Sequence, residues 1–473
     1  MKRVNISGLA VLAALISILF LAFIQHGILL VAGIVVLIFI IVLTWKQYLP
    51  NVFTFIMIFH WAQVFTYVLF VNSVWHGDLN VLTNSSVRAY LSSLAGIIVM
   101  SFVFNKIAYR KIYISSSQFE EAIDQINPKK VLQLYIVLYI MSGLLNGQAF
   151  SFGSLTQIFL NIALLKWAGF VLLGYLSFRK KDYRIFFAIA FVLDFVSGFF
   201  SFFSSFKEVF FYAAIVAMTY ITAINFSVSL KGIAVALLLF FIGVVWTVVK
   251  GNYREFLNEG SKQQVVTVSQ EQAYDKFSDL LSVVNKETFT EGIGQFFYRL
   301  QYVYHLSKAM DYVPAKEPFQ HGALWRQTIK FTTVPRILDP DKGEYDASKK
   351  ASRFTGIQYL GQAQGVSFSL GYFADCYVDF GIPGMFVALA VLAFIWSKIY
   401  RFFLLKATGN IVINYAIVAS FFVQFCFFEM DGTFMFGRMF TTFVVFAFLK
   451  YTLFPGMEKF VVFKDKTFIK FND

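Results

Sequence analysis

Five basic side chains gather in one polar stretch, VPRILDPDKGEYDASKKASRF, from Val334 to Phe354 of an otherwise mostly apolar chain. Pro335 and Pro340 rule out a continuous helix, and DPDKG is typical of a turn in which Gly343 is free to take a positive φ. Arginine grips phosphate oxygens with a bidentate fork and lysine adds a compact charge, so the turn suits a lipid diphosphate. A solvated loop with ordinary surface charges is an equal alternative. The five basic residues are Arg336, Lys342, Lys349, Lys350 and Arg353.

A second polar group precedes this stretch, in the segment GQFFYRLQYVYHLSKAM of residues 294–310. We predict one helix there, with Tyr298, Gln301, Tyr302 and His305 on a common side. Aromatic faces beside hydrogen-bonding tips suit pyranose rings, which favours a surface that binds sugar. The same residue types also suit a membrane interface, and that alternative is the more common one.

Three charged residues fall inside apolar runs that are long enough to cross a membrane. Lys166 lies in IALLKWAGF, Asp194 in FVLDFVSGF and Arg438 in MFGRMFTT. Because a charge in hydrocarbon costs at least about 2.5 kcal/mol on insertion scales, each must face the protein interior, a cavity or an interface. We expect Lys166 and Asp194 to form a buried pair, and Arg438 to act as a further phosphate ligand.

The elements that position these residues are apolar helices. The chain has 473 residues, of which 58% are hydrophobic and 19% aromatic, a composition that predicts a membrane protein. We predict an all-α polytopic fold with about 12 transmembrane helices, within a range of 11 to 13, because about 20 apolar residues cross the hydrocarbon core. The predicted spans are 8–25, 27–44, 51–71, 89–109, 131–147, 156–177, 185–204, 209–228, 232–249, 381–400, 410–428 and 433–453.

The distribution of lysine and arginine predicts the orientation. With the N-terminus in the cytoplasm, most basic residues fall on the cytoplasmic side, as the positive-inside rule requires. The first apolar run continues into the second without a small-residue cleavage site, so we expect it to be retained. The predicted parts are a nine-helix bundle (1–249), a large external loop with amphipathic helices (250–366), three C-terminal helices (367–453) and a basic cytoplasmic tail (454–473).

Several classes of protein are disfavoured. The net charge of +13 follows from a basic inner rim that faces anionic membrane lipids, so nucleic acid is not needed as a partner. Two cysteines and five scattered histidines give no disulfide framework and no zinc motif. The sequence has no Gly-rich phosphate loop and no Ser-His-Asp pattern, which argues against an ATPase and a serine protease.

The order of four motifs resembles the Wzy-type polymerases, which join the oligosaccharide repeat units of O-antigen and capsular polysaccharide. The motifs are RL at Arg299, VPAKEPFQHG from Val313, VPRILDPDKG from Val334 and GYFADCYVDFGIPG from Gly371. The specific part covers about 90 residues. The chain departs from the family pattern at four positions. Asp339 stands where the family commonly has an aromatic residue and Gly343 where it has proline, while Asp375 replaces the commoner glutamate and Asp379 the commoner asparagine.

The resemblance implies a bundle like that of the GT-C membrane glycosyltransferases, acting without metal or other cofactor in the cytoplasmic membrane, with its site on the outer face. The implied reaction is attack by a sugar hydroxyl on the anomeric carbon of a second glycan, with polyprenyl diphosphate as the leaving group. Polyprenyl diphosphate-linked oligosaccharides would be donor and acceptor, and a flippase and a chain-length regulator would be partners.

The residues divide into three expected roles under this resemblance. Asp375, Asp379 or His305 would serve as the base or orient the acceptor. Arg336, Lys342, Arg299, Arg353 and Arg438 would bind the diphosphate. Tyr298, Tyr302, Tyr372 and Tyr377 would contact glycan. For Asp375 and Asp379, capping of a nearby helix end is the competing interpretation.

Two other functions stay open. A ligase that moves finished glycan to another acceptor would use the same donor chemistry. A flippase or transporter of lipid-linked sugars would also have about twelve spans, although such proteins usually contain internal repeats and paired interrupted helices, which this chain lacks.

Overall fold

The computed structural model describes residues 4–81, 83–149, 153, 155–199, 205–260, 266–334, 339, 342–343, 345–361 and 366–463. Within these residues the regular structure is helical, and β-structure is limited to two isolated bridges. Helices of the first half are α1 (Ser7–Phe23), α2 (Gly27–Thr44), α3 (Val52–Val74), α4 (Ser86–Val103), α5 (Ser116–Asp124), α6 (Pro128–Gln148), α7 (Thr156–Ala163), α8 (Leu165–Arg179), α9 (Arg184–Phe199), α10 (Glu208–Tyr220) and α11 (Phe226–Leu257).

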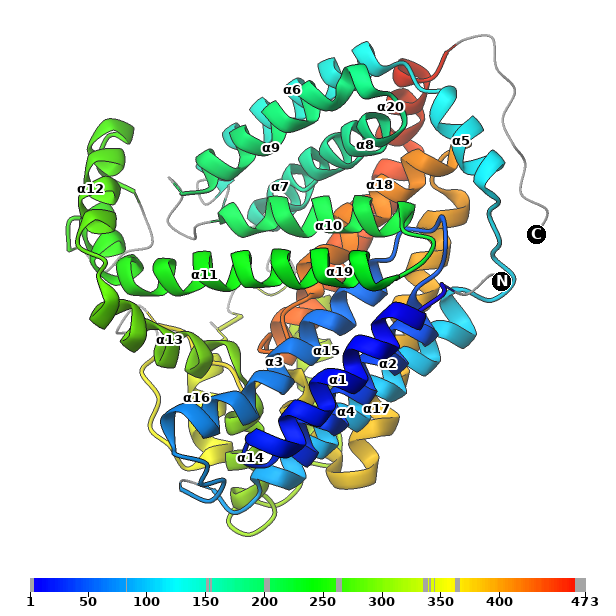
Figure 1. The fold of residues 1–473 in the computed structure, drawn as a ribbon. Helices are drawn as coiled ribbons and strands as arrows, with labels where there is room; N and C mark the ends of the chain where they lie inside the picture. The colour runs from blue at the N-terminus through cyan, green and yellow to red at the C-terminus, as the bar shows by residue number, and fades with distance from the viewer. Residues whose placement is uncertain are drawn as a thin grey trace.

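The second half begins with five shorter helices and ends with four longer or more apolar ones. They are α12 (Gln270–Ser282), α13 (Lys286–Leu300), α14 (Val303–Tyr312), α15 (Ala323–Thr333), α16 (Ala347–Thr355), α17 (Tyr372–Lys406), α18 (Ile411–Phe422), α19 (Gly432–Tyr451) and α20 (Leu453–Val461). In Figure 1, α14 and α16 lie at one end of the bundle and α5 and α20 at the other. The polar helices α14 and α16 therefore lie at the end opposite α5 and α20, whereas α12 stands apart from them beside α11.

Eight helical segments of the described residues are long and apolar enough to cross a membrane, which is consistent with a helical protein embedded in one. They are Gly27–Thr44, Val52–Val74, Ser86–Ala108, Pro128–Gln148, Thr156–Arg179, Phe226–Leu257, Tyr372–Lys406 and Gly432–Tyr451. The other four predicted spans coincide with shorter helices, which are α1, α9, α10 and α18. Each predicted span thus overlaps a helix, while a count of twelve crossings stays a prediction.

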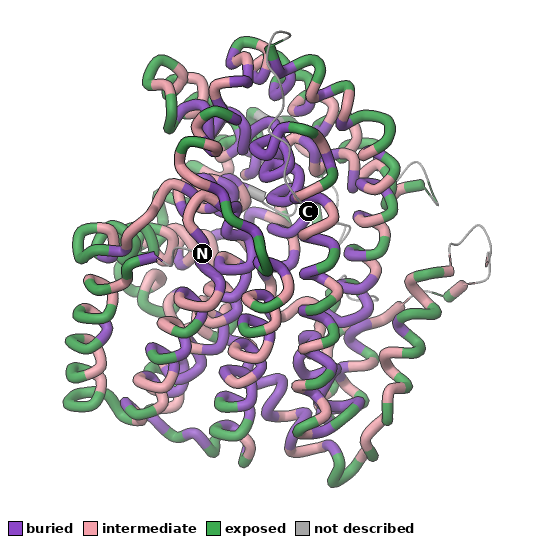
Figure 2. The backbone as a smooth tube through the Cα atoms, turned by 90° about the vertical axis from the view of Figure 1, so that its right-hand side faces the viewer, coloured by how far each residue is buried: buried purple, intermediate pink, exposed green. Residues whose placement is uncertain are grey.

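The core of the bundle surrounds α18. All twelve residues of this helix are buried, as expected for a helix that is apolar on every side. It packs against α17 and α8, while α17 packs also against α4. Figure 2 shows buried segments in the interior of the bundle and exposed segments along its outside. Helix α11 exposes much of its length. The exposed side chains on the outer helices are largely apolar, as a lipid-facing surface requires.

Several boundaries differ from the sequence prediction, among them the end of the predicted span 209–228, because α10 ends at Tyr220. Helix α11 continues to Leu257, beyond the predicted end of its span at residue 249. The predicted helix over 294–310 is two helices, because Gln301 adopts an extended backbone and its side-chain oxygen accepts the Tyr304 N–H at 3.2 Å. Helix α17 begins at Tyr372 and is interrupted by non-helical backbone at Gly381 and Ile382. The acidic motif before this interruption is therefore helical.

Candidate functional site

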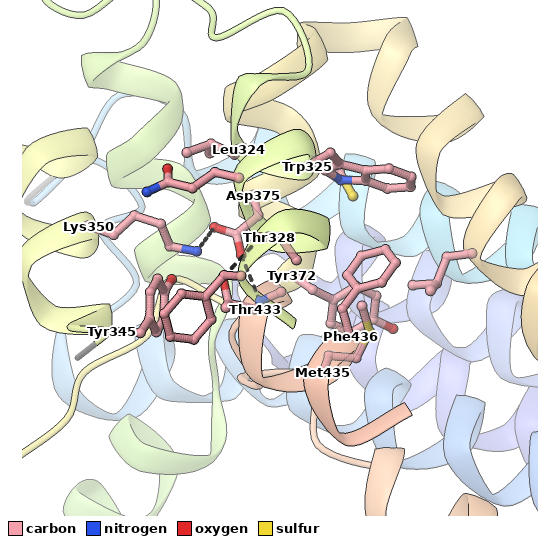
Figure 3. A pocket seen from close by; sticks show the side chains of 15 residues that line it. Leu324, Trp325, Thr328, Tyr345, Lys350, Tyr372, Asp375, Thr433, Met435 and Phe436 are labelled. Carbon is pink, nitrogen blue, oxygen red and sulfur yellow. Dashed lines mark hydrogen bonds and ion pairs between the residues drawn. The ribbon is translucent and has the colours of Figure 1, made fainter. Parts of the chain in front are cut away.

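A lysine shared by two carboxylates joins the polar helices to the bundle. The Lys350 Nζ lies 2.7 Å from Asp375 Oδ1 and 2.6 Å from Asp431 Oδ2. Lys350 comes from α16, Asp375 from the first turn of α17, and Asp431 is the residue that precedes α19. Figure 3 shows the Lys350 and Asp375 side chains pointing toward one another across a pocket. We call Lys350, Asp375 and Asp431 the ion triad.

Helix ends fix both carboxylates. Asp431 is the N-cap of α19: its Oδ1 accepts the Thr433 N–H at 2.7 Å and the Tyr345 hydroxyl at 2.8 Å. Asp375 Oδ2 accepts the Gly432 N–H at 2.8 Å. A Cβ at position 432 would lie 2.7 Å from that same oxygen, so the approach requires glycine. The N-terminus of α19 thus supplies the amide donors that hold both carboxylates around one ammonium group.

A small cavity of about 30 Å³ adjoins the ion triad. Its polar wall includes Asp375, Lys350, Tyr345 and the hydrogen-bonded pair Thr328 and Thr433, whose hydroxyl oxygens are 3.0 Å apart. The remaining wall is mostly apolar and comes from α15, α17 and α19. The volume matches a single water molecule. In this conformation, therefore, the cavity admits one small polar group beside the carboxylates.

The charges of the ion triad sum to −1 when all three groups are ionised. Burial alone would lower the pKa of Lys350, but the attraction of Asp375 and Asp431 outweighs it and raises that pKa well above the usual value for lysine. Burial also raises the pKa of the neighbouring Tyr345, which keeps its hydroxyl protonated as a donor. Lys350 is thus a permanent cation at physiological pH.

Asp379, the second acidic residue of the same motif, has a different environment. Its two oxygens accept the N–H groups of Leu324 at 3.0 Å and Trp325 at 2.9 Å, at the start of α15. It therefore caps a helix from 55 residues away in sequence. The competing interpretation of a helix cap describes its contacts, although the capped helix is α15 and not the following span.

His305 lies inside an aromatic cluster. The side chain is 2% exposed, and its Nδ1 lies 2.9 Å from the Tyr359 hydroxyl. Burial lowers the pKa of His305 to about 3, so the imidazole is neutral at physiological pH. Its ring centroid is 4.6 Å from that of Tyr302. A neutral imidazole can accept a proton, but this one is enclosed by side chains.

Three of the four tyrosines predicted to contact glycan use their hydroxyls inside the protein. Tyr302 donates to the Ser369 carbonyl, Tyr377 donates to the Val313 carbonyl at 2.8 Å, and the Tyr372 hydroxyl lies 2.7 Å from His60 Nε2. Tyr298 is 43% exposed and packs its ring near Phe70. Of these four, Tyr298 alone presents a broad accessible ring in this conformation.

The basic residues predicted to bind diphosphate do not converge on one point. Arg336 lies outside the described residues. Lys342 donates to the carbonyls of Phe331 and Val334, and Arg353 lies 3.5 Å from Glu317 in an exposed ion pair. Arg299 lies on α13 and is an exposed residue. Neighbouring protein groups remove part of the water around its guanidinium, which lowers the pKa of Arg299, and the attraction of Glu429 opposes this shift.

The charges inside the apolar helices form a second polar group. Lys166 Nζ lies 2.8 Å from Asp194 Oδ1, as the sequence predicts, and Tyr135 donates to the other Asp194 oxygen at 2.8 Å. Glu208 at the start of α10 interacts electrostatically with Lys166 and with Arg438 of α19. Within the described residues Arg438 has no ion-pair or hydrogen-bond partner for its guanidinium. The side chain is therefore available to an anion.

Lys350 was one of five basic residues of the polar stretch in the sequence, and nothing paired it with Asp431 or Tyr345. The helical period does distinguish Lys350. Ala347, Ala351 and Phe354 are buried at i, i+4 and i+7 of α16, and position 350 is the i+3 member of the same face. The adjacent Lys349 points to solvent.

Metal chemistry finds no support among the side chains. Within the part of the chain that the structure describes, no group of three or more His, Cys, Asp or Glu side chains is placed to hold a metal ion. Cys376 and Cys426 are free and buried. The ion triad itself contains an ammonium group where a cation would have to bind.

Comparison with known proteins identifies a family but no activity. Residues 103–456 match the model of a domain of unknown function, DUF8712, which includes the ion triad and the charges inside the apolar helices. No curated protein and no solved structure matches the chain. Since the match spans well over half of the sequence, the chain belongs to the DUF8712 family.

Proposed function

We propose that this protein is a membrane glycosyltransferase that polymerises polyprenyl diphosphate-linked oligosaccharide repeat units into a surface polysaccharide. One observation carries the proposal: Lys350 and Asp375 pair at 2.7 Å. Asp375 belongs to the acidic motif of residues 371–384, and Lys350 follows the motif VPRILDPDKG by seven residues in the same polar stretch. The polar stretch that begins with one motif of the resemblance thus meets the other motif beside a polar cavity.

The proposed reaction forms a bond between an acceptor hydroxyl oxygen and the anomeric carbon of the donor. The bond from that carbon to the diphosphate oxygen breaks, and polyprenyl diphosphate leaves with the electron pair. Asp375 takes the hydroxyl proton. Among the three predicted bases it suits this role best, because Asp375 lines the cavity, whereas Asp379 accepts backbone amides of α15 and His305 lies in an aromatic cluster.

Fixed cations lower the barrier by receiving the charge that develops on the diphosphate. Arg438 supports this role because its guanidinium has no partner among the described residues and it lies in an apolar helix, where an unpaired charge is costly. Arg299, which Glu429 attracts, is a second candidate, and Arg336 remains a prediction. Lys342 and Arg353 would have to leave their present partners to bind a phosphate.

The proposal includes the finer topology. Twelve spans in a GT-C-like arrangement, with both termini in the cytoplasm, would place the ion triad at the outer face of the cytoplasmic membrane. The basic residues of the opposite end would then face anionic lipid head groups. A flippase would supply the lipid-linked units and a chain-length regulator would act on the same product.

The test is reconstitution. Purified protein in liposomes is mixed with a polyprenyl diphosphate-linked repeat unit from the host, and the product is resolved on a gel. We expect a ladder of polymer lengths that Asp375→Asn abolishes, whereas Lys349→Met, a change at an exposed residue of α16, leaves it intact. Transfer of one glycan to a different acceptor, without a ladder, would identify the protein as a ligase and not a polymerase. Movement of labelled lipid between leaflets without a ladder would identify a transporter.

A further inference from the structure

Within the proposed reaction, the ion triad has an asymmetry that separates its two carboxylates. Asp431 holds three donors, which are the Thr433 N–H, the Tyr345 hydroxyl and the Lys350 ammonium. Asp375 holds two, the Gly432 N–H and the same ammonium. Because an ionised carboxylate offers about four acceptor positions, Asp375 keeps more capacity for a hydroxyl of a substrate.

The geometry points to Lys350 as a positioning residue, which Asp431 holds in place so that its ammonium keeps Asp375 ionised and directed at the cavity. This inference rests on the proposed function, since it concerns how the base of that reaction is prepared. Lys350 itself does not need to touch the substrate. Its role follows from its two contacts of 2.7 and 2.6 Å with the carboxylates.

Burial makes the ammonium necessary. The side chain of Asp375 is 6% exposed and that of Asp431 is fully buried, so two like charges lie together in a site with little water. A buried pair of carboxylates without a cation takes up a proton, because like charges disfavour each other and low dielectric disfavours both. A protonated Asp375 cannot accept the hydroxyl proton. Lys350 supplies the one positive charge that prevents this outcome.

Among the described residues, Lys350 is the cation that contacts Asp375, whereas Lys342 lies over the Phe331 ring and donates to the Phe331 and Val334 carbonyls. From α17 the titratable neighbours are Cys376 and Asp379, from the segment before α16 Tyr345, and from α19 Asp431. Lys349, the nearest lysine in sequence, is exposed on the other side of α16. Electrostatic control of Asp375 therefore depends on Lys350.

The first test is kinetic and uses the full-length protein in liposomes with the polyprenyl diphosphate-linked repeat unit. For Lys350→Met we expect a loss of kcat of roughly 100-fold or more, the scale of general base catalysis, with a KM for donor changed by less than about twofold. The pH at half-maximal rate should move upward by about one unit or more. Lys350→Arg should recover at least about tenfold of the loss, and Lys349→Met should behave as wild type.

The inference would be overturned if Lys350→Met changed only KM or left the pH profile unchanged. It would also be overturned if Lys350→Arg had no higher kcat than Lys350→Met while the two variants melted at the same temperature. These outcomes would assign Lys350 to substrate binding or to structure. If the wild-type protein forms no ladder at all, the proposed function fails, and the state of Asp375 is then decided by chemical labelling.

The labelling test needs no activity. Dicyclohexylcarbodiimide is apolar and reacts with protonated carboxyl groups in apolar surroundings. At neutral pH, mass spectrometry should find the label on Asp375 in Lys350→Met but not in wild type or Lys349→Met. The Lys350→Met, Asp375→Asn double variant controls for labelling elsewhere. Equal labelling of Asp375 in wild type and Lys350→Met would show that Lys350 does not keep the carboxylate ionised.

Discussion

Gly432 offers a direct test of how closely the ion triad is built. A Cβ at this position would lie 2.7 Å from Asp375 Oδ2, a distance that real Cβ atoms essentially never show. Asp375 cannot simply move aside, because its other oxygen is held by Lys350. Gly432→Ala should therefore break the bond of 2.8 Å between the Gly432 N–H and the carboxylate.

The magnitude follows from two opposing contributions. Loss of a hydrogen bond to a charged group costs about 1.5–3 kcal/mol. Replacing glycine by alanine in a helix returns about 0.5–1 kcal/mol, because the unfolded chain loses freedom. We expect a net loss of about 1–2 kcal/mol in the free energy of unfolding. Gly437→Ala in the same helix is the matched control, since its Cβ would meet only the Thr332 Cγ2 at 3.4 Å.

The assay is a double-mutant cycle on unfolding in detergent, with the polymer ladder as a second measurement. In an Asp375→Ala background the clash partner is missing, so Gly432→Ala should cost at least about 1 kcal/mol less than in wild type. An equal cost in both backgrounds would refute the reasoning, because the added methyl group would then be acting on something other than the carboxylate. Equal effects of Gly432→Ala and Gly437→Ala would refute it as well.

Three further predictions concern Lys166, His305 and Arg438. Lys166→Met leaves the Asp194 carboxylate without its cation and should lower the free energy of unfolding by about 3–5 kcal/mol. The double variant Lys166→Met, Asp194→Leu should recover most of this loss, and an equal loss in the single and double variants would contradict the prediction. His305 is neutral because its pKa lies near 3, so it contributes stability above about pH 6.5 that is lost as pH falls toward 3, by about 1.4 kcal/mol per pH unit. The melting temperature of His305→Phe should therefore fall less steeply between pH 6.5 and pH 3 than that of wild type, and an equal fall would contradict this prediction. Arg438→Met should lower the polymerisation rate roughly 100-fold at normal membrane levels, and full activity would exclude its role.

Hydropathy predicted the bundle well because burial in lipid leaves a long apolar run for each helix. The twelve predicted spans all overlap helices, and the pairing of Lys166 with Asp194 is confirmed. The internal break of α17 has a local cause, because Gly381 takes a positive φ and Pro383 favours the extended backbone of Ile382; the predicted span begins at this position, but the helical segment before it was not predicted. The division of 294–310 into two helices likewise depends on one side chain, Gln301, turning back to cap α14.

The candidate site was predictable in its residue types and only partly in its contacts. Sequence placed basic residues and carboxylates in neighbouring stretches, but the bond of Asp379 to the start of α15 spans 55 residues and leaves no trace in spacing. The partner of Asp375 was hidden for a different reason. Two lysines stand side by side at 349 and 350, and only the rotation of α16 decides which one is buried.

The two acidic residues of one motif show how position along a helix separates structural from chemical roles. Asp375 and Asp379 lie four residues apart, so both leave α17 on the same side, toward the polar helices. Asp379 meets the start of α15, where two amide groups use both of its oxygens. Asp375 meets one amide and the Lys350 ammonium, and it lines the cavity. Under the proposed function, the chemistry therefore belongs to Asp375 and the architecture to Asp379.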